Sequence, residues 1–231
     1  VPGEAMWSER NLASAVAGYG VVGTGVAGDR AGGRELSKRR ACRDIVIKPV
    51  GAKSLDEQCS YPVPEGAALV TDVNAICDDP EIDVAVELMG GTGIAGTFIL
   101  KALQNGKHVV TANKALLAEN GRDLFRIAGE KHLHLGYEAS VCGAIPIMQT
   151  MRESLAGNNI LTLSGILNGT CNYILSAMTA KGQSFAEALK EAQQLGFAEA
   201  DPTLDIEGFD AAHKLVLPIR PAWGVEYPFT E

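Results

Sequence analysis

The sequence predicts an α/β protein, with a Rossmann-like, doubly wound parallel sheet followed by an incomplete α+β domain. From about residue 83 onward, short apolar runs alternate with stretches of helical periodicity, the β-α-β-α-β order that builds a parallel sheet. Nearer the N-terminus, an apolar run leads into a glycine-rich loop at 18–23. We expect the first domain to cover residues 1–144 and the second to cover 145–231.

Composition excludes several classes of protein. The chain has 231 residues, of which 46% are hydrophobic and 21% are charged, as in a globular protein with a sizeable core. Its net charge of -8 disfavours non-specific nucleic-acid binding, which needs clustered lysine and arginine. No apolar run approaches the roughly 20 residues of a membrane-spanning helix. The five cysteines lack CxxC spacing and are odd in number, so we expect no disulfide framework and a cytoplasmic protein.

Apolar periodicity predicts the elements of the first domain. A first strand is expected at 12–17, whereas the region 25–60 is rich in glycine and arginine and predicts no regular helix. The strand-like run at 44–50 contains Pro49, which lacks the N–H of a sheet ladder and is rare in central strands. The remaining elements are strands at 83–89, 108–111 and 133–137 and helices at 94–105 and 116–130.

The second domain has mainly helical patterns. After Pro146 a helix should run to about Leu155, and a strand-like run follows at 160–167. Ser184 and Glu187 have the spacing of a capping box at the start of a helix. Further helices are expected at 171–180, 186–195 and 208–217, and the tail at 218–231 predicts no regular element.

The glycine loop has the spacing of a turn that binds the pyrophosphate of a dinucleotide. In such a turn the first glycine permits the bend, the second lets the backbone approach the pyrophosphate, and the third allows close helix–strand packing. The N-terminus of the following helix supplies N–H donors and a positive dipole end. A glycine turn without a ligand is the alternative, but the β-α-β order favours a cofactor. The cofactor-binding residues expected here are Gly18, Gly20, Val21, Val22 and Gly23.

The end of the second expected strand bears on the choice between NAD and NADP. NAD-binding sites usually carry Asp or Glu there, to bond the ribose 2′-hydroxyl. This chain has Lys53 and Ser54 instead, and a basic residue beside a hydroxyl suits a 2′-phosphate. The sequence therefore favours NADP over NAD, with an ordinary surface lysine as the alternative for Lys53.

Five segments carry a family resemblance. They are VELMGG at 86–91, VTANKA at 110–115, YEASVCGAIP at 137–146, GILNGTCNY at 165–173, and the whole of 195–214. In this order and spacing they resemble homoserine dehydrogenases, over roughly 12–217 and most densely from about residue 63. The resemblance implies reversible, NAD(P)-dependent interconversion of L-homoserine and L-aspartate 4-semialdehyde, in threonine, methionine and isoleucine biosynthesis. It also implies a homodimer that acts on a small-molecule substrate.

Two residues near the end of the chain are suited to acid–base chemistry. Asp210 and Lys214 stand four apart on a predicted helix and so share one face. A surface ion pair of little energetic value is the alternative. Oxidation of an alcohol requires loss of the O–H proton as hydride leaves the carbon, and a suitably placed lysine can take that proton. Lys214 matches the acid/base lysine of the family, so we expect it to be the catalytic residue.

A dense acidic stretch precedes this lysine. An amino-acid substrate needs a partner for its ammonium group, and a carboxylate supplies one. Most of these carboxylates should be solvated. The resemblance implies substrate binding by Glu199 and Asp210, with Asp205 as a second-rank candidate.

Lys114 follows the strand at 108–111 and so stands at the carboxyl edge of the sheet, where open α/β folds bind ligands. A cation at a helix N-terminus opposes the helix dipole, which favours a functional role over an ordinary surface position. The resemblance implies that Lys114 binds both cofactor and substrate. It places Gly90, Gly91 and Thr111 in the same crevice.

The bend after the strand at 133–137 offers a carboxylate and backbone carbonyl groups. Oxygen ligands of this kind suit a hard cation, although the residues alone predict only a turn. In the family this segment holds a monovalent cation, typically sodium. The matching ligands are the side chain of Glu138 and the backbone carbonyls of Val141, Gly143 and Ile145.

Two departures from the family leave alternatives open. The region 25–60 fits poorly, and the chain ends soon after Lys214, whereas family members continue for about a hundred residues. We therefore expect a shortened chain that is poorly active alone; the alternative is a truncated, non-catalytic remnant that still binds nucleotide. A third hypothesis is another Rossmann dehydrogenase acting on a related semialdehyde, but no cysteine or histidine stands out for attack on the reacting carbon.

Overall fold

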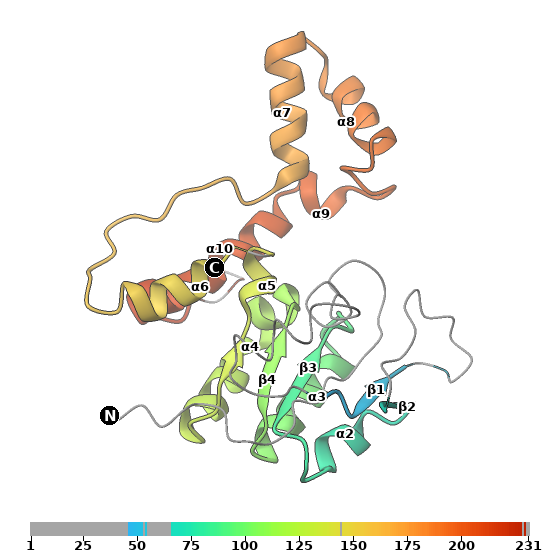
Figure 1. The fold of residues 1–231 in the computed structure, drawn as a ribbon. Helices are drawn as coiled ribbons and strands as arrows, with labels where there is room; N and C mark the ends of the chain where they lie inside the picture. Colours follow the sequence, from blue (N-terminus) through green and yellow to red (C-terminus); the bar gives the residue numbers. More distant parts are fainter. Residues whose placement is uncertain (1–45, 53, 55–65, 144, 228, 230–231) are drawn as a thin grey trace. The chain divides into compact units, whose positions relative to one another are not determined.

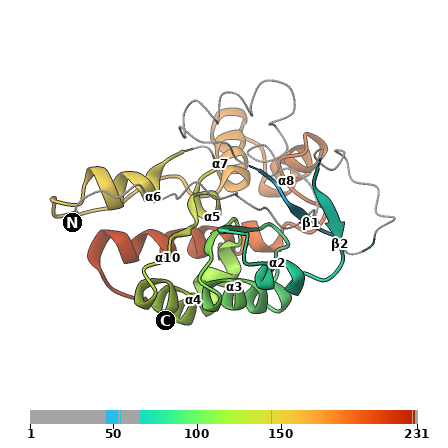
Figure 2. The same ribbon diagram turned by 60° about the horizontal axis from the view of Figure 1, so that its bottom comes forward.

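The chain divides into two compact units, Val1–Ile147 and Met148–Glu231. The computed structural model describes residues 46–52, 54, 66–143, 145–227 and 229. The first expected strand, the glycine loop and Lys53 lie outside these residues. Figure 1 shows the ribbon with its elements labelled, and Figure 2 shows it from a second direction.

The first unit contains short parallel strands in two sheets. In one sheet β1 pairs with β2, and in the other the order is β3-β4-β5. The strands are β1 (Pro49–Gly51), β2 (Ala68–Val70), β3 (Val84–Glu87), β4 (His108–Thr111) and β5 (Leu135–Gly136). The second sheet confirms the three parallel strands that periodicity predicts after residue 83, whereas β2 was missed.

Pro49 was expected to interrupt a strand, but it begins one. It is the first residue of β1 and lies opposite Ala68 in the parallel register. At the first position of a strand the missing N–H of proline removes little from the ladder.

The first unit has four helices among its described residues: α2 (Asn74–Asp78), α3 (Ile94–Gln104), α4 (Lys114–Glu130) and α5 (Glu138–Val141). In the second sheet α3 connects β3 to β4 and α4 connects β4 to β5, whereas α2 precedes β3 and α5 follows β5. The predicted helices α3 and α4 are confirmed, and α2 was missed. In Figure 2, α2, α3 and α4 lie side by side, and α3 contacts both of the others. The backbone of α4 departs from helical angles at Asn120, just before Gly121.

The core of the first unit lies between β3 and α3. All four residues of β3 are buried, including Glu87. Phe98, Ile99 and Leu103 of α3 are also buried, at the spacing of one helix face. Burial of each such large apolar side chain stabilises the fold by roughly 1.5–3 kcal/mol. The helix α3 also contacts β4, which pairs with β3, so both strands pack against the same helix.

The second unit is helical in the part that the structure describes. Its elements are α6 (Ile147–Gln149), the π-helical η2 (Thr150–Ser154), α7 (Gly169–Lys181), α8 (Phe185–Gln194), α9 (Thr203–Ile206) and α10 (Phe209–Trp223). The helix expected after Pro146 forms as α6 followed by η2. The capping box of Ser184 and Glu187 is present at the start of α8.

The helices α7 and α8 pack against each other around a small apolar core. Its buried residues are Ile174, Ala177, Ala188, Ala192 and Ala198, with Tyr173, Met178 and Leu189 packed against them. Between the helices, Gly182 takes the left-handed conformation with φ 66, which ends α7.

Two expectations for this unit are wrong. No strand forms at 160–167, where no described strand is available to pair and where Leu161 and Ile166 are 89% and 74% exposed. The last helix, α10, does not end at Pro218 but continues through it to Trp223. The helix contains both Pro218 and Pro221, and a proline inside a helix costs about 3 kcal/mol. Burial of Leu217 and Pro218, together with contact between α10 and η2, acts against this cost.

None of the helices in the described residues is both long enough and apolar enough to pass through a bilayer.

Candidate functional site

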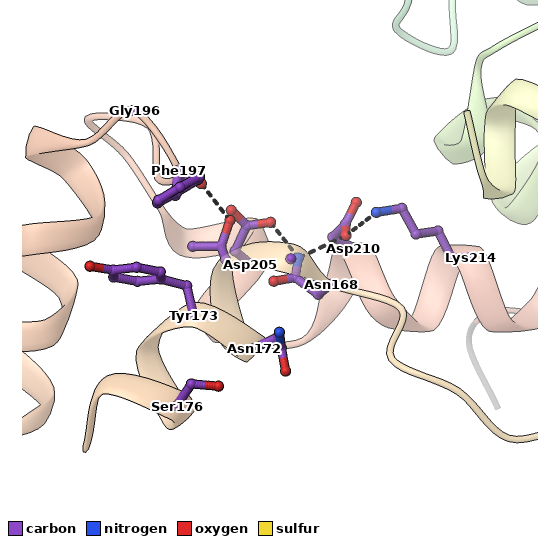
Figure 3. Close-up of a pocket in the computed structure, with 11 residues that line it drawn as sticks. Asn168, Asn172, Tyr173, Ser176, Gly196, Phe197, Asp205, Asp210 and Lys214 are labelled. Atoms are coloured by element: carbon purple, nitrogen blue, oxygen red, sulfur yellow. Dashed lines mark hydrogen bonds and ion pairs between the residues drawn. The ribbon is translucent and has the colours of Figure 1, made fainter. Parts of the chain in front are cut away.

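A pocket of about 600 Å³ lies in the second unit beside the start of α7 (Figure 3). Its lining comes from α7, the turn after α8, α9 and the first turns of α10. Four polar residues of the lining are linked to one another: Asn168, Asp205, Asp210 and Lys214. The pocket is therefore lined by side chains that are far apart in the sequence.

Asn168 organises these side chains because it caps α7. Its side-chain oxygen accepts a hydrogen bond from the Cys171 N–H at 2.7 Å, as an N-cap residue does. The Nδ2 group therefore faces the two carboxylates. It donates to Asp205 Oδ1 at 2.7 Å and to Asp210 Oδ2 at 2.8 Å. The dashed lines of Figure 3 show Asn168 between these carboxylates.

Asp210 and Lys214 form the expected pair on one face of α10. Their Nζ and Oδ2 atoms are 2.6 Å apart, and Lys214 Nζ also donates to the Leu167 carbonyl at 3.1 Å. The side chain of Asp210 is 9% exposed and that of Lys214 is 23% exposed. The pair is therefore not an ordinary surface ion pair, because the carboxylate is buried and the ammonium end borders the pocket.

The carboxylates outnumber the cation among the linked residues, which leaves this side of the pocket negative. This negative charge also acts on the neighbouring thiol of Cys171. Burial, followed by the negative charges of Asp205 and Asp210, raises the pKa of Cys171. The thiol donates to the Asp205 carbonyl, with Sγ 3.1 Å from the oxygen. A negative pocket suits a ligand that carries an ammonium group.

Only some residues of the acidic stretch at 199–210 line this pocket. Asp205 and Asp210 line the pocket, whereas Glu199 is exposed and is absent from the lining. The backbone carbonyl of Glu199 accepts a bond from Gln193 Nε2 at 3.2 Å, in the turn that follows α8.

A second set of predicted residues lies in the first unit, at the carboxyl ends of β3 and β4. Thr111 ends β4 opposite Glu87, the last residue of β3. Gly90 and Gly91 follow β3 with φ 74 and 71, a left-handed conformation that favours glycine. Lys114 begins α4 two residues after Ala112, and its side chain is half-buried.

The expected cation ligands lie in one short stretch of the first unit. Glu138 begins α5 and Val141 ends it, so the carbonyl groups of its last turn point beyond the helix. The Ile145 carbonyl accepts the N–H of Ile147 at 2.8 Å. A carbonyl oxygen has two lone pairs, so this bond leaves a second acceptor position. Gly143 is exposed.

Three buried polar residues of these sites, Glu87, Asn113 and Asn168, were not predicted from the sequence. Each one lies inside a segment that carried the resemblance, but none has a spacing that predicts its role. The usable signals are an asparagine before a helix start and one carboxylate within the apolar run of β3.

Comparison with protein-family models gives two matches. The model described as homoserine dehydrogenase, NAD binding domain, matches residues 18–138. The model described as homoserine dehydrogenase matches residues 146–231. The first match alone spans more than half of the chain.

The chain belongs to the homoserine dehydrogenase family. It contains the family's NAD-binding domain and part of its second domain, as the resemblance implied. The glycine loop falls inside the match to the NAD-binding domain, although it lies outside the described residues.

Curated relatives agree with this membership. The homoserine dehydrogenase of Neisseria gonorrhoeae is 46% identical over 213 residues, which cover 92% of this chain and 48% of the relative. That of Pseudomonas aeruginosa is 46% identical over 215 residues, covering 93% and 49%. The chain thus spans about half the length of these curated homoserine dehydrogenases.

Solved structures agree on the fold. A homoserine dehydrogenase from Thiobacillus denitrificans superposes with a TM-score of 0.85 at 43% identity, covering 96% of this chain and 51% of the other. The S. aureus homoserine dehydrogenase at pH 7.5 gives a TM-score of 0.77 at 39% identity, covering 96% and 53%.

Proposed function

We propose that this homoserine dehydrogenase chain interconverts L-homoserine and L-aspartate 4-semialdehyde with a nicotinamide dinucleotide. The observation that carries the proposal is the pairing of Lys214 with the buried Asp210 at the pocket. Bound NAD(P) supplies the hydride acceptor, and the protein must supply a group that takes the alcohol proton.

Lys214 is the proton-transfer group in this proposal. An ammonium group has three N–H donors. Two of them are used by Asp210 and the Leu167 carbonyl, which hold the amine in place and leave the third direction for a substrate oxygen. In reduction Lys214 gives its proton to the carbonyl oxygen, and in oxidation the neutral amine takes the hydroxyl proton. Asp210 holds the amine of Lys214 in position.

The substrate's own ammonium group is assigned to the acidic side of the pocket. Asp205 is half-buried there and Asp210 is buried. Asn168 donates hydrogen bonds to both carboxylates and so holds them in one orientation. Glu199 is exposed and stays a substrate-binding candidate on the family resemblance alone. Comparing the homoserine KM of Glu199→Gln and Asp210→Asn tests this ranking. A larger effect of the Glu199 substitution would reverse it.

The dinucleotide is assigned to the glycine loop and to the carboxyl edge of the β3-β4-β5 sheet. Apart from the glycine and its two chain neighbours, no atom of the described residues lies within 4 Å of the point where a Cβ of Gly90 or Gly91 would stand. A ligand can therefore approach this backbone closely. Thr111 and Lys114 complete this edge. We also propose a preference for NADP over NAD, on the basis of Lys53. The ratio of the Kd for NAD to the Kd for NADP measures this preference, and Lys53→Ala should lower that ratio relative to the parent.

Sodium is proposed as the monovalent cation of the first unit, held by the Glu138 carboxylate and the carbonyls of Val141, Gly143 and Ile145. The fit rests on the oxygen donors at the end of α5 and on one carboxylate, a hard-ligand set. The cation would brace this segment and take no part in proton transfer. Replacing sodium by a large organic cation should lower the thermal midpoint, and Glu138→Gln should remove this response.

One assay tests the central proposal. NADP reduction with homoserine is measured beside a nucleotide-binding titration of the same chain. Turnover with binding supports the dehydrogenase. Binding without turnover would instead support a nucleotide-binding remnant, and absence of both would refute each proposal. Light scattering of the same sample tests the proposed homodimer.

A further inference from the structure

A closed ring of hydrogen bonds joins the ends of β3 and β4 in the first unit. Glu87 Oε1 accepts the Gly90 N–H at 3.0 Å, and Glu87 Oε2 accepts the Thr111 hydroxyl at 2.6 Å. Asn113 donates its N–H to Thr111 Oγ1 at 3.0 Å and its Nδ2 group to the Gly91 carbonyl at 2.7 Å. Because Gly90 and Gly91 are adjacent, these bonds form one circuit, here called the Glu87 ring.

Each hydrogen bond in the Glu87 ring has a donor and an acceptor that can be named. The backbone N–H of Asn113 donates to one lone pair of Thr111 Oγ1, and the Thr111 hydroxyl donates to Glu87. Oδ1 of Asn113 is held by the Leu116 N–H at 3.1 Å, which directs Nδ2 to Gly91. The side chain at position 87 thus accepts hydrogen bonds at both of its oxygens, which glutamine, with a single oxygen, cannot do.

Burial of the Glu87 side chain costs free energy, because it removes a polar group from water. Glu87 is 0% exposed, and none of the described residues forms an ion pair with it. Its Oε1 also accepts the Met89 N–H at 2.7 Å, so three donors converge on one buried group. Burial of an unpaired charge is tolerated only when hydrogen bonds replace water. An apolar residue would fill this core position without that cost, which indicates that the ring serves more than packing.

We propose that Glu87 is a positioning residue for the nicotinamide half of the dinucleotide. A doubly wound fold has two mononucleotide-binding halves, one after the other in the chain. The strands β3, β4 and β5 follow β1 and β2 in the chain and form their own parallel sheet, so we assign them to the second half. The ring fixes the turn at Gly90–Gly91 and, through Asn113, the N-terminus of α4 with Lys114. This inference rests on the proposed nucleotide binding. It adds that Glu87 acts on one half of the ligand only.

The test compares two ligands in the full chain. The Glu87→Gln variant keeps the shape of the side chain but presents an NH₂ group to one of its donors. We expect its Kd for NADP to rise about tenfold, equal to about 1.4 kcal/mol. The Kd for adenosine 2′,5′-bisphosphate, which is the adenosine half alone, should change less than about twofold. The matched control is Glu130→Gln at the other end of α4, about 25 Å away along a 17-residue helix.

Three results would overturn the proposal: equal weakening of both ligands, unchanged NADP binding by a folded Glu87→Gln variant, or the same effect from Glu130→Gln. If the parent chain binds neither ligand, the proposed function itself fails. Amide hydrogen exchange then still tests the ring without ligand. Exchange at Met89 and Gly90 should be at least tenfold faster in Glu87→Gln, and unchanged rates would refute the ring. Thr111→Val, which removes a different link, provides the second variant if Glu87→Gln does not fold.

Discussion

The two polar networks of this chain differ in what they leave accessible. In the Glu87 ring the side chains of Glu87, Thr111 and Asn113 are all buried, and their hydrogen bonds close on one another. In the second unit, Asp210 is buried too, but its partner Lys214 is partly exposed and borders a pocket. A closed network holds a shape, whereas an open one can also exchange a proton with a ligand. We therefore assign positioning to the first network and proton transfer to the second.

The largest effect is expected where the open network loses its exchangeable proton. Lys214→Arg retains the positive charge beside Asp210, but a guanidinium is not deprotonated in proteins. Homoserine oxidation should fall by about 10²- to 10⁴-fold, the usual contribution of a general base. Steady-state kcat measures this, and the exposed Lys190→Arg on α8 is the control. If the kcat of Lys214→Arg stayed within a few-fold of the parent value, the second network would have no role in proton transfer that distinguishes it from the first.

Asn168→Asp separates the capping role of Asn168 from its role in the pocket. The new carboxylate can still cap α7, but it replaces the donor that faces Asp205 and Asp210. Loss of hydrogen bonds to charged groups, at about 1.5–3 kcal/mol, predicts a drop in kcat/KM for homoserine of roughly 10- to 100-fold. Helix content by circular dichroism should stay unchanged. Asn159→Asp, at an exposed site of the same unit, is the matched control.

Lys107 tests the opposite end of the same sheet. It precedes β4, is 4% exposed, and its Nζ donates to the carbonyls of Asp79 and Ile82. Lys107→Met leaves buried acceptors without donors and should lower the free energy of unfolding by about 2 kcal/mol. Nucleotide Kd should not change, because ligands bind at the carboxyl ends of the strands. Urea unfolding with a nucleotide titration measures both, and the exposed Lys131→Met should cost much less.

The smallest effect is expected from a third network, on the surface of α7 and α8. Hydrogen bonds from Lys181, Gln183 and Tyr173 lower the pKa of Glu191 from its ordinary value of 4.5 to about 2. A lowered carboxyl pKa stabilises the fold above pH about 4.5, and this stability is lost as the pH falls toward 2. The thermal midpoint of Glu191→Gln should therefore lie below that of the parent at pH 7. The gap should close near pH 2, and a constant gap would contradict this origin.

Local patterns predicted most of the fold, and tertiary contacts decided the rest. The capping box of α8 and the strand at β4 depend on neighbouring residues, so local patterns predict both. The spacing of Asp210 and Lys214 also placed them on one face of α10. In contrast, Asn168 meets carboxylates 37 and 42 positions away, which no local pattern encodes. The expected strand at 160–167 failed for the same reason, because pairing depends on a distant partner.

The most direct test of the assignment is chemical rescue of Lys214→Ala. This substitution removes the amine and leaves space beside Asp210 for a small primary amine from solution. If Lys214 transfers the substrate proton, homoserine oxidation should be nearly absent without added amine. It should then rise with amine concentration and with the basicity of the amine. Near-parental turnover without amine, or a folded and nucleotide-binding variant that no amine restores, would contradict proton transfer by Lys214.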